Sequence, residues 1–232
     1  MAVIEVKKLT KTYHETVVPV HALNGIDLVF DKGEFTAIVG PSGCGKTTLL
    51  NMMGGLDEPT SGDVLVESED ISKMRPSQLV DFRLHNIGFI FQSYNLIPVL
   101  TVKENVEFIM ELQHRGREQM NERVDYLLEA MGITDKKNVR PKYLSGGQQQ
   151  RVAVARALAS QPKFILADEP TANLDSKSTD ALLDLMASLN QKEEVTFIFS
   201  THDQRVMDKA RRIITLEDGK VIHDSKYALK DE

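Results

Sequence analysis

Residues suited to phosphate chemistry stand at 40–47, which read Gly-Pro-Ser-Gly-Cys-Gly-Lys-Thr and fit the pattern G-x-x-x-x-G-K-[ST]. The glycines let backbone N–H groups surround phosphate oxygens, and a helix beginning there adds partial positive charge. Lys46 is expected to reach the β- and γ-phosphates, and the Thr47 hydroxyl to bind Mg²⁺. The residues predicted to contact ATP are Gly40, Pro41, Ser42, Gly43, Cys44, Gly45, Lys46, Thr47 and Thr48.

Two carboxylates end an apolar segment, Phe-Ile-Leu-Ala-Asp-Glu, at residues 164–169. Ligands of open α/β sheets bind at the carboxyl ends of the strands. Because neighbouring side chains on a strand point in opposite directions, Asp168 and Glu169 are expected to have different roles. We assign Asp168 to the Mg²⁺ shell and Glu169 to polarising the attacking water. The alternative is a pair of solvated acids at a strand end.

A second glycine-containing motif is Leu-Ser-Gly-Gly-Gln, at the start of an expected helix. Ser145 and Gln148 could form a capping box, but capping alone gives no reason for two helix-destabilising glycines. A bare helix N-terminus with a serine hydroxyl also binds phosphate, and one nucleotide needs only one such cradle. We therefore expect this motif to serve ATP held by a second copy, in a dimer. The residues concerned are Leu144, Ser145, Gly146, Gly147 and Gln148.

Hydrophobic periodicity indicates the elements that must position these residues. Strands are expected at 4–6, 26–30, 35–39, 64–66, 87–91, 164–167, 195–200 and 213–216. Helices are expected at 48–53, 102–113, 122–131, 146–160 and 176–191, and a polar run at 115–121 separates the second helix from the third. Strands alternating with helices predict an α/β fold whose parallel sheet is covered on both faces. We predict a single domain, 1–232, with a helical subdomain inserted at about 93–160.

Composition restricts the partners and the compartment. The 28 Lys and Arg residues against 34 Asp and Glu give a net charge of −6, which disfavours bulk attraction to nucleic acid or anionic lipid. The single Cys44 cannot form an internal disulfide, as is usual in a reducing cytoplasm. No apolar run approaches the roughly 18 residues of a membrane span, and the N-terminus lacks a signal-peptide pattern. We expect no nucleic-acid partner and no direct membrane insertion.

The order of the motifs resembles the nucleotide-binding subunit of ATP-binding cassette (ABC) transporters over essentially the whole chain. The phosphate loop is followed by Gln92, the Leu-Ser-Gly-Gly-Gln motif, the Asp-Glu pair and His202. The resemblance implies a P-loop NTPase core with an antiparallel β subdomain, and ATP and Mg²⁺ as cofactors. It further implies an ATPase that forms a homodimer on ATP binding. Its partner is then a transmembrane permease, which holds it at the cytoplasmic face of the cell membrane.

The same resemblance implies roles for individual side chains. Tyr13 matches the aromatic residue that stacks on adenine, although it could be an ordinary strand aromatic. Gln92 matches the residue that touches Mg²⁺ and the attacking water, and His202 the residue that contacts the γ-phosphate. Asp175, in Ala-Asn-Leu-Asp, matches a loop that crosses the dimer interface, and it could also cap the helix at 176–191.

A finer resemblance rests on residues 54–62, 91–98 and 100–106. These segments look like the lipoprotein-releasing and macrolide-exporting branch (LolD- and MacB-like), to which the cell-division ATPase FtsE is close. Tyr143 departs from that pattern, since Glu or Gln is expected before the Leu-Ser-Gly-Gly-Gln motif. The alternatives are a signalling ATPase coupled to a membrane complex and a soluble ATPase acting on nucleic acid or ribosomes. The chain lacks the coiled-coil insertions or tandem cassettes of the latter class.

Overall fold

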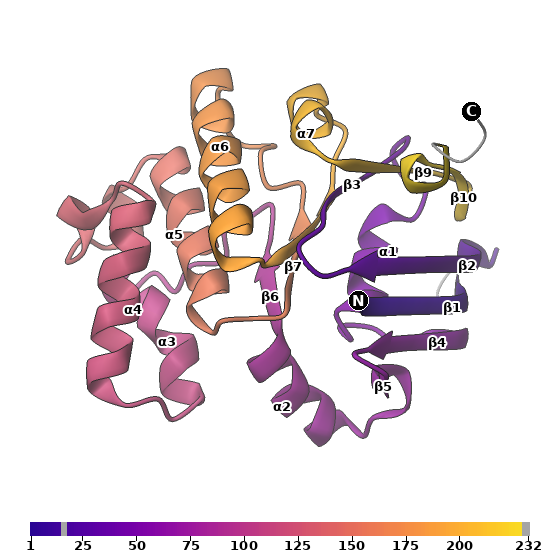
Figure 1. The fold of residues 1–232 in the computed structure, drawn as a ribbon, viewed down its shortest axis with the longest axis horizontal. Helices are drawn as coiled ribbons and strands as arrows, with labels where there is room; N and C mark the ends of the chain where they lie inside the picture. The colour runs from indigo at the N-terminus through magenta and orange to yellow at the C-terminus, as the bar shows by residue number, and fades with distance from the viewer. Residues whose placement is uncertain (15–17, 229–232) are drawn as a thin grey trace.

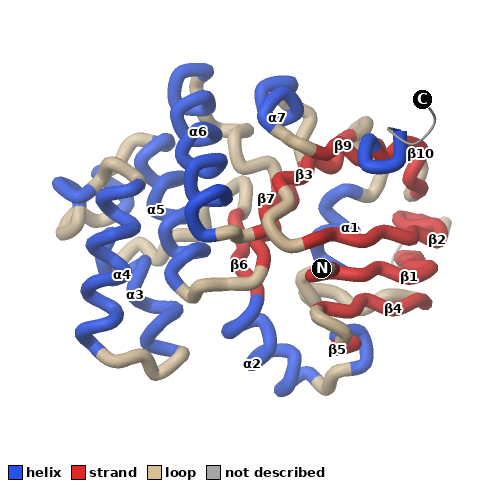
Figure 2. Tube along the Cα trace, in the orientation of Figure 1, coloured by secondary structure: helices blue, strands red, loops and turns tan. Residues whose placement is uncertain are grey.

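The computed structural model describes residues 1–14 and 18–228. An antiparallel sheet, a mixed sheet with its covering helices, and a group of helices lie side by side (Figure 1). In the orientation of Figure 2, the helical group is at the left and the antiparallel sheet at the right. The mixed sheet lies between them and connects the two.

The antiparallel sheet has the strand order β2-β1-β4-β5. Its strands are β1 (Ala2–Tyr13), β2 (Val20–Asp31), β4 (Ser61–Val66) and the short β5 (Glu69–Asp70). Alternate residues such as Ile4, Val6 and Leu28 are buried against the core. Register shifts interrupt this alternation in β1, one of them between Val6 and Leu9.

The second sheet has the order β10-β9-β3-β8-β7-β6. Its strands are β3 (Phe35–Val39), β6 (Ile87–Ile90), β7 (Phe164–Asp168), β8 (Thr196–Ser200), β9 (Arg212–Glu217) and β10 (Lys220–Asp224). All pairs are parallel except the β9–β10 hairpin. Every residue of β8 is buried, as expected of a central parallel strand covered on both faces.

The helices are α1 (Lys46–Met53), α2 (Pro76–Asn86), α3 (Val102–Leu112), α4 (Arg117–Ala130), α5 (Gly146–Ala159), α6 (Ser176–Glu193), α7 (Gln204–Lys209) and α8 (Ser225–Ala228). Short 3₁₀ turns span Ile71–Lys73, Thr134–Lys136 and Pro141–Tyr143. One core cluster joins α1 to both sheets, and another joins α3, α4, α5 and α6. The helical group therefore packs on the mixed sheet through α5 and α6.

The structure confirms the predicted α/β fold with its antiparallel sheet, and it corrects several boundaries. Most of the polar run 115–121 belongs to a helix, because α4 begins at Arg117 and not at residue 122. The helix predicted at 48–53 begins at Lys46, and the strand predicted at 4–6 is longer, since β1 spans Ala2–Tyr13. The elements β5, α2, α7, β10 and α8 were not predicted.

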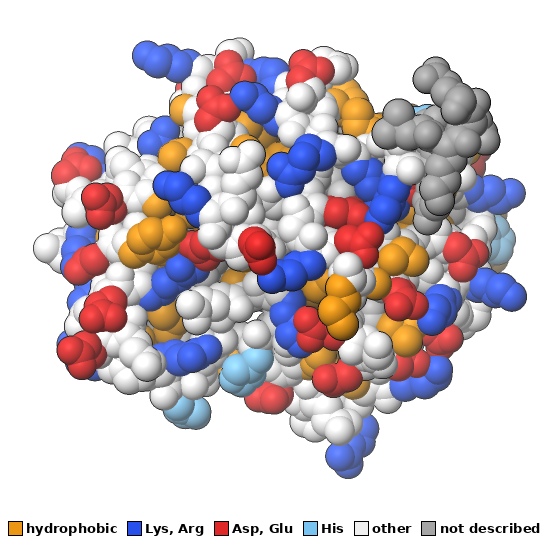
Figure 3. Space-filling model, in the orientation of Figure 1, with side chains coloured by type: hydrophobic (Ala, Val, Ile, Leu, Met, Phe, Trp, Pro, Cys, Tyr) orange, Lys and Arg blue, Asp and Glu red, His pale blue; other side chains and the backbone are white. Residues whose placement is uncertain are grey.

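The surface agrees with the modest net charge. On the face drawn in Figure 3, basic and acidic side chains are interspersed rather than separated into large fields of one sign. Among the residues that the structure describes, no helix combines the length and the hydropathy required to cross a bilayer.

Candidate functional site

The loop between β3 and α1 is packed too tightly for any residue but glycine at two positions. Gly40 has φ 147°, and a Cβ built there would lie 2.1 Å from the Leu216 carbonyl oxygen. Gly45 has φ 104° and is the N-cap of α1; its Cβ would lie 2.4 Å from the Ala22 carbonyl oxygen. These positions need both a left-handed backbone and the absence of a side chain. The loop is thereby held against β9 and β2.

Lys46 is the first residue of α1, and its side chain folds back over the loop. Its Nζ donates to the carbonyl oxygens of Gly40 at 2.8 Å and Pro41 at 3.0 Å. The ammonium group therefore sits over the backbone that the sequence predicts as a phosphate cradle. A cation above a helix N-terminus is an arrangement suited to binding anions.

Asp168 and Glu169 contact different groups. The Thr47 hydroxyl donates to both carboxylate oxygens of Asp168, at 3.0 and 3.2 Å, and the Ser200 hydroxyl also bonds to Asp168. Glu169 has φ 47° and so turns away from the strand, which brings its Oε1 to 2.8 Å from Nδ1 of His202. Its Oε2 is buried and has no hydrogen-bond partner among the described residues. The two acids therefore have different hydrogen-bond partners.

These side chains meet because four parallel strands end at one edge of the sheet. β3 leads into the phosphate loop, β6 ends two residues before Gln92, β7 ends at Asp168, and β8 ends two residues before His202. Sequence reasoning missed Ser200, which pairs in register with Asp168 across β7 and β8. Two apolar strands that both end in a polar residue were the available signal.

A cavity of about 700 Å³ lies along this edge. Tyr13 of β1 lines it, as do Glu169 and His202, which follow β7 and β8. Cys44 belongs to the phosphate loop, but its side chain is buried. Among the described residues, neither Cys44 nor Asp168 lines the cavity. The lining residues are Tyr13, Val20, Ala22, Gly40, Pro41, Ser42, Gly43, Gly45, Lys46, Thr47, Thr48, Gln92, Glu169 and His202.

The Leu-Ser-Gly-Gly-Gln motif lies elsewhere, at the N-terminus of α5. Ser145 and Gln148 form the capping box, with Gln148 N–H donating to Ser145 Oγ at 3.3 Å. A Cβ on Gly146 would lie 3.0 Å from the Tyr94 hydroxyl, and one on Gly147 would lie 3.2 Å from Ser178 Oγ. A side chain at either position would therefore crowd a neighbouring side chain of the same chain, a contact with no local signal in the sequence.

Asp175 adopts the capping position open to it. It is the N-cap of α6, and its carboxylate accepts hydrogen bonds from the Ser178 hydroxyl at 2.7 Å and the Ser178 N–H at 2.9 Å. These bonds hold the pKa of the Asp175 carboxyl below its ordinary value. Because capping uses both oxygens, any contact across an interface has to share them.

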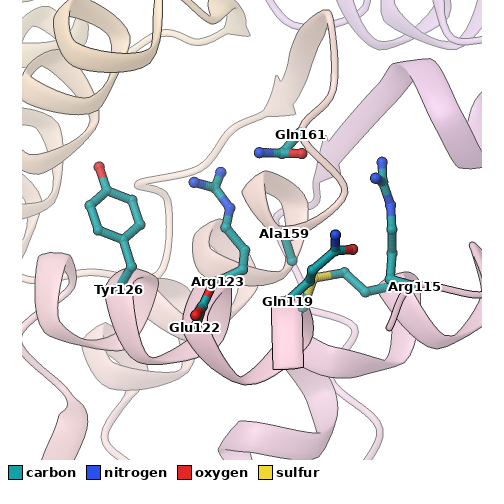
Figure 4. Close-up of a pocket in the computed structure, with 8 residues that line it drawn as sticks. Arg115, Gln119, Glu122, Arg123, Tyr126, Ala159 and Gln161 are labelled. Carbon is teal, nitrogen blue, oxygen red and sulfur yellow. The ribbon is translucent and has the colours of Figure 1, made fainter. Parts of the chain in front are cut away.

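A second cavity, of about 520 Å³, contains none of the predicted residues. Figure 4 shows Arg123 and Tyr126 projecting into it from α4, with Gln161 at the opposite side. Arg123 is already paired with Glu193 through two hydrogen bonds, at 3.0 and 2.7 Å. The lining residues are Met110, Arg115, Gln119, Glu122, Arg123, Tyr126, Ala159 and Gln161.

Comparison with known families identifies the family of the chain. The sequence profile described as ABC transporter matches residues 23–172, more than half of the chain. The chain belongs to this family. As an ABC cassette it binds ATP and is an ATPase.

Relatives and solved structures agree with this family. This ABC ATPase is 44% identical over 222 residues to the lipoprotein-releasing system ATP-binding protein LolD 1 of Rhodopseudomonas palustris, covering 94% of this chain and 98% of the relative. It is 44% identical to the macrolide export ATP-binding/permease protein MacB of Hyphomonas neptunium, covering 99% of this chain but 36% of that longer protein.

A solved structure matches at TM-score 0.88 and 41% identity, covering 96% of this chain and 97% of the other. It is the dimeric post-hydrolysis state of the cassette MJ0796 of Methanocaldococcus jannaschii, bound to ADP and Pi. ABC cassettes form dimers and act with membrane permease components, and the chain is the ATP-binding component of such a transporter.

Proposed function

We propose that this ABC ATPase works as a homodimer that closes head to tail around two ATP molecules. Each copy supplies its own phosphate loop to one ATP and residues 144–148 to the ATP of the other copy. The position of that motif supports this arrangement, because Ser145 is exposed while none of the five residues lines the cavity of its own chain. The dimeric form of MJ0796 also supports it.

Within each site, we assign roles by position. Tyr13 stacks on adenine, and Lys46 neutralises the β- and γ-phosphates as charge develops in hydrolysis. Glu169 polarises the attacking water, while His202 and Gln92 orient the water and the γ-phosphate. The unpaired Oε2 of Glu169 carries the assignment of the general base, since a buried carboxylate oxygen without a donor accepts a water hydrogen bond readily.

The Thr47 and Asp168 pair fits Mg²⁺. A hydroxyl and a carboxylate 3.0 Å apart are hard oxygen ligands, and Mg²⁺ typically takes few protein ligands together with substrate phosphates and water. Thr47 and Gln92 would contact the ion directly, and Asp168 would hold its shell with the support of Ser200. When bound, the ion neutralises charge on the transferring phosphate.

We further propose that the dimer sits at the cytoplasmic face of the cell membrane, attached to a permease through the Gln92 loop and the helices α3–α5. ATP-driven closure and opening of the dimer then move the permease, in export, lipoprotein release or mechanotransmission. The similarity to LolD and MacB proteins supports this branch. The alternative within the branch is a signalling ATPase coupled to a membrane complex, like FtsE.

The test is Glu169→Gln, which keeps the size of the side chain and removes its basicity. The variant is expected to bind ATP, to elute as a stable dimer only when ATP is present, and to hydrolyse ATP at least about 100-fold more slowly. Size-exclusion chromatography with light scattering and a phosphate-release assay measure the two effects. Glu118→Gln, a change of an exposed acid on α4, is the matched control and should behave as wild type.

Rapid phosphate release by Glu169→Gln rules out the role of Glu169 as general base. A monomer under ATP, with hydrolysis abolished, contradicts the head-to-tail dimer instead. The partner is then tested by capturing tagged Glu169→Gln protein with ATP from detergent-solubilised membranes and identifying the proteins that are recovered with it. Recovery of a many-span permease with a solute-binding protein contradicts the proposed branch.

A further inference from the structure

Beside Tyr13, which lines the cavity, one carboxylate holds two side chains that come from another part of the chain. Asp57 lies between α1 and β4, and Lys11 and Tyr13 are at the end of β1. The Tyr13 hydroxyl donates to Asp57 Oδ2 at 2.9 Å. The Lys11 ammonium donates to Asp57 Oδ1 at 2.8 Å, so each carboxylate oxygen has its own donor.

Lys11 also contacts the tyrosine ring. Its Nζ lies over the ring at 4.8 Å from the centroid and donates to the Glu58 carbonyl at 2.7 Å. The Lys11 side chain is only 13% exposed, so this ammonium is held in place rather than free in solvent. The cation occupies one face of the Tyr13 ring, and the ring lines the cavity that the phosphate loop also lines.

Asp57 is itself fixed by the backbone around it. Glu58 N–H donates to Asp57 Oδ1 at 2.7 Å. Two further hydrogen bonds join this segment to β1: Thr60 N–H donates to the Thr10 carbonyl, and Thr12 N–H donates to the Thr60 hydroxyl, each at 2.9 Å. Burial raises the pKa of the Asp57 carboxyl, but hydrogen bonds from Lys11 and Tyr13 outweigh it and hold the pKa below the ordinary value. The carboxylate is therefore charged at neutral pH and available as a strong acceptor.

We propose that Asp57 is a positioning residue for adenine recognition, which fixes the Tyr13 ring through its hydroxyl group and orients Lys11 over one face. The proposal rests on the proposed role of Tyr13 in stacking on adenine. A ring that is already held loses less conformational entropy when a base stacks on it, so the affinity is greater. It also explains why tyrosine rather than phenylalanine serves here, since only the hydroxyl reaches Asp57.

The test is a double-mutant cycle with Asp57→Ala and Tyr13→Phe in the full chain. Binding of Mg²⁺-ATP and of magnesium tripolyphosphate, which lacks adenine, is measured by calorimetry. Each single variant is expected to weaken ATP binding about threefold to tenfold, the loss of one hydrogen bond, and to leave tripolyphosphate binding unchanged. The double variant should be no weaker than Asp57→Ala alone, because that change already removes the acceptor of the Tyr13 hydroxyl.

Two further variants sharpen the comparison. Asp57→Asn keeps an acceptor for the Tyr13 hydroxyl and should bind ATP more tightly than Asp57→Ala. Asp63→Ala removes a more exposed Lys–Asp pair, Lys73–Asp63 at 2.7 Å, in which Asp63 lies on β4, and should not change ATP binding. Additive losses, an equal loss for tripolyphosphate, or no loss with Asp57→Ala overturn the proposal.

The variant Tyr13→Ala distinguishes the positioning role of Asp57 from the stacking role of Tyr13 on which it rests. If Tyr13→Ala leaves the preference for ATP over tripolyphosphate intact, the stacking role of Tyr13 is wrong and the role of Asp57 is excluded with it. If Tyr13→Ala removes that preference while Asp57→Ala does not, only the positioning role of Asp57 is wrong.

Discussion

At the scale of single residues, the glycines of the phosphate loop differ in what they allow. Gly40 and Gly45 each face a backbone carbonyl at under 3 Å from where a Cβ would be, whereas a Cβ on Gly43 meets no atom within 4 Å. All three have positive φ. The pattern G-x-x-x-x-G-K-[ST] contains the two crowded positions and leaves Gly43 variable, which agrees with this geometry.

Gly40→Ala is therefore expected to destabilise the fold by about 2–4 kcal/mol, through strain and a backbone clash, and to abolish ATP binding. Gly43→Ala, the control, is expected to lose only about 1–2 kcal/mol of unfolding free energy, because its backbone is left-handed but a Cβ there meets no atom. Urea denaturation followed by circular dichroism gives both free energies of unfolding. Equal losses in the two variants contradict the clash with the Leu216 carbonyl.

At the scale of elements, sequence predicted best where burial follows a simple period. Strands β3, β7 and β8 are continuous apolar runs, and α3 has a capping box at Thr101 and Glu104; all were predicted within one or two residues. In α2 only Phe82 is buried, so its apolar signal is weak. The first turn of α4 is polar and exposed, which hid its start at Arg117.

For the candidate site, sequence patterns indicated the residues near strand ends, but they did not indicate contacts between distant segments. Residues at or just after strand ends, such as Gln92, Asp168 and His202, are found from local pattern and topology. Contacts between distant segments are not: Tyr13 meets Asp57 across 44 positions, and Gly146 meets Tyr94, with no local signal for either. The side-chain partners of a loop depend on tertiary packing.

The ion pair Arg123–Glu193 joins α4 to the end of α6, and Arg123 also donates to the Leu158 carbonyl of α5 at 2.7 Å. Both side chains are mostly buried, at 15% and 17% exposure. Arg123→Met is expected to cost about 2 kcal/mol, because it leaves a carboxylate and a carbonyl without their donor. Lys209→Met, which breaks the exposed pair with Asp184, should cost less than about 0.5 kcal/mol. If urea denaturation shows similar losses of unfolding free energy for the two variants, Arg123 does not stabilise the contact between α4, α5 and α6.

At the scale of the whole molecule, a charged network closes the C-terminal segment onto the sheets. The Arg212 guanidinium, 5% exposed, donates to Asp224, to Glu34 and to the Val29 carbonyl. The Lys226 ammonium donates to Asp31 at 2.6 Å and to Glu34 at 2.8 Å. These contacts connect β9, β10 and α8 with the end of β2 and the start of β3.

This network makes stability depend on acid pH. Burial raises the pKa of the Glu34 and Asp224 carboxyls, but hydrogen bonds from Lys226 and Arg212 outweigh it and hold both below their ordinary values. A carboxyl whose pKa is lower in the folded state stabilises above its unfolded pKa, and this contribution is lost as the pH falls through the folded value. The free energy of unfolding should therefore be steady above about pH 5 and fall below about pH 4. Asp224→Asn should show a shallower fall in urea denaturation; an identical pH profile contradicts the contribution of Asp224.

The cavity is shared between two sheets, and this has a consequence for persistence in the cell. Tyr13, Val20 and Ala22 belong to the antiparallel sheet, whereas Glu169 and His202 follow strands of the mixed sheet. A nucleotide that fills this space ties the sheets together as a removable brace. Binding raises the free energy of unfolding by about 2.7 kcal/mol when the concentration of free nucleotide is 100 times its Kd. Resistance to heat and to proteases should therefore rise with the free concentration of the nucleotide relative to its Kd.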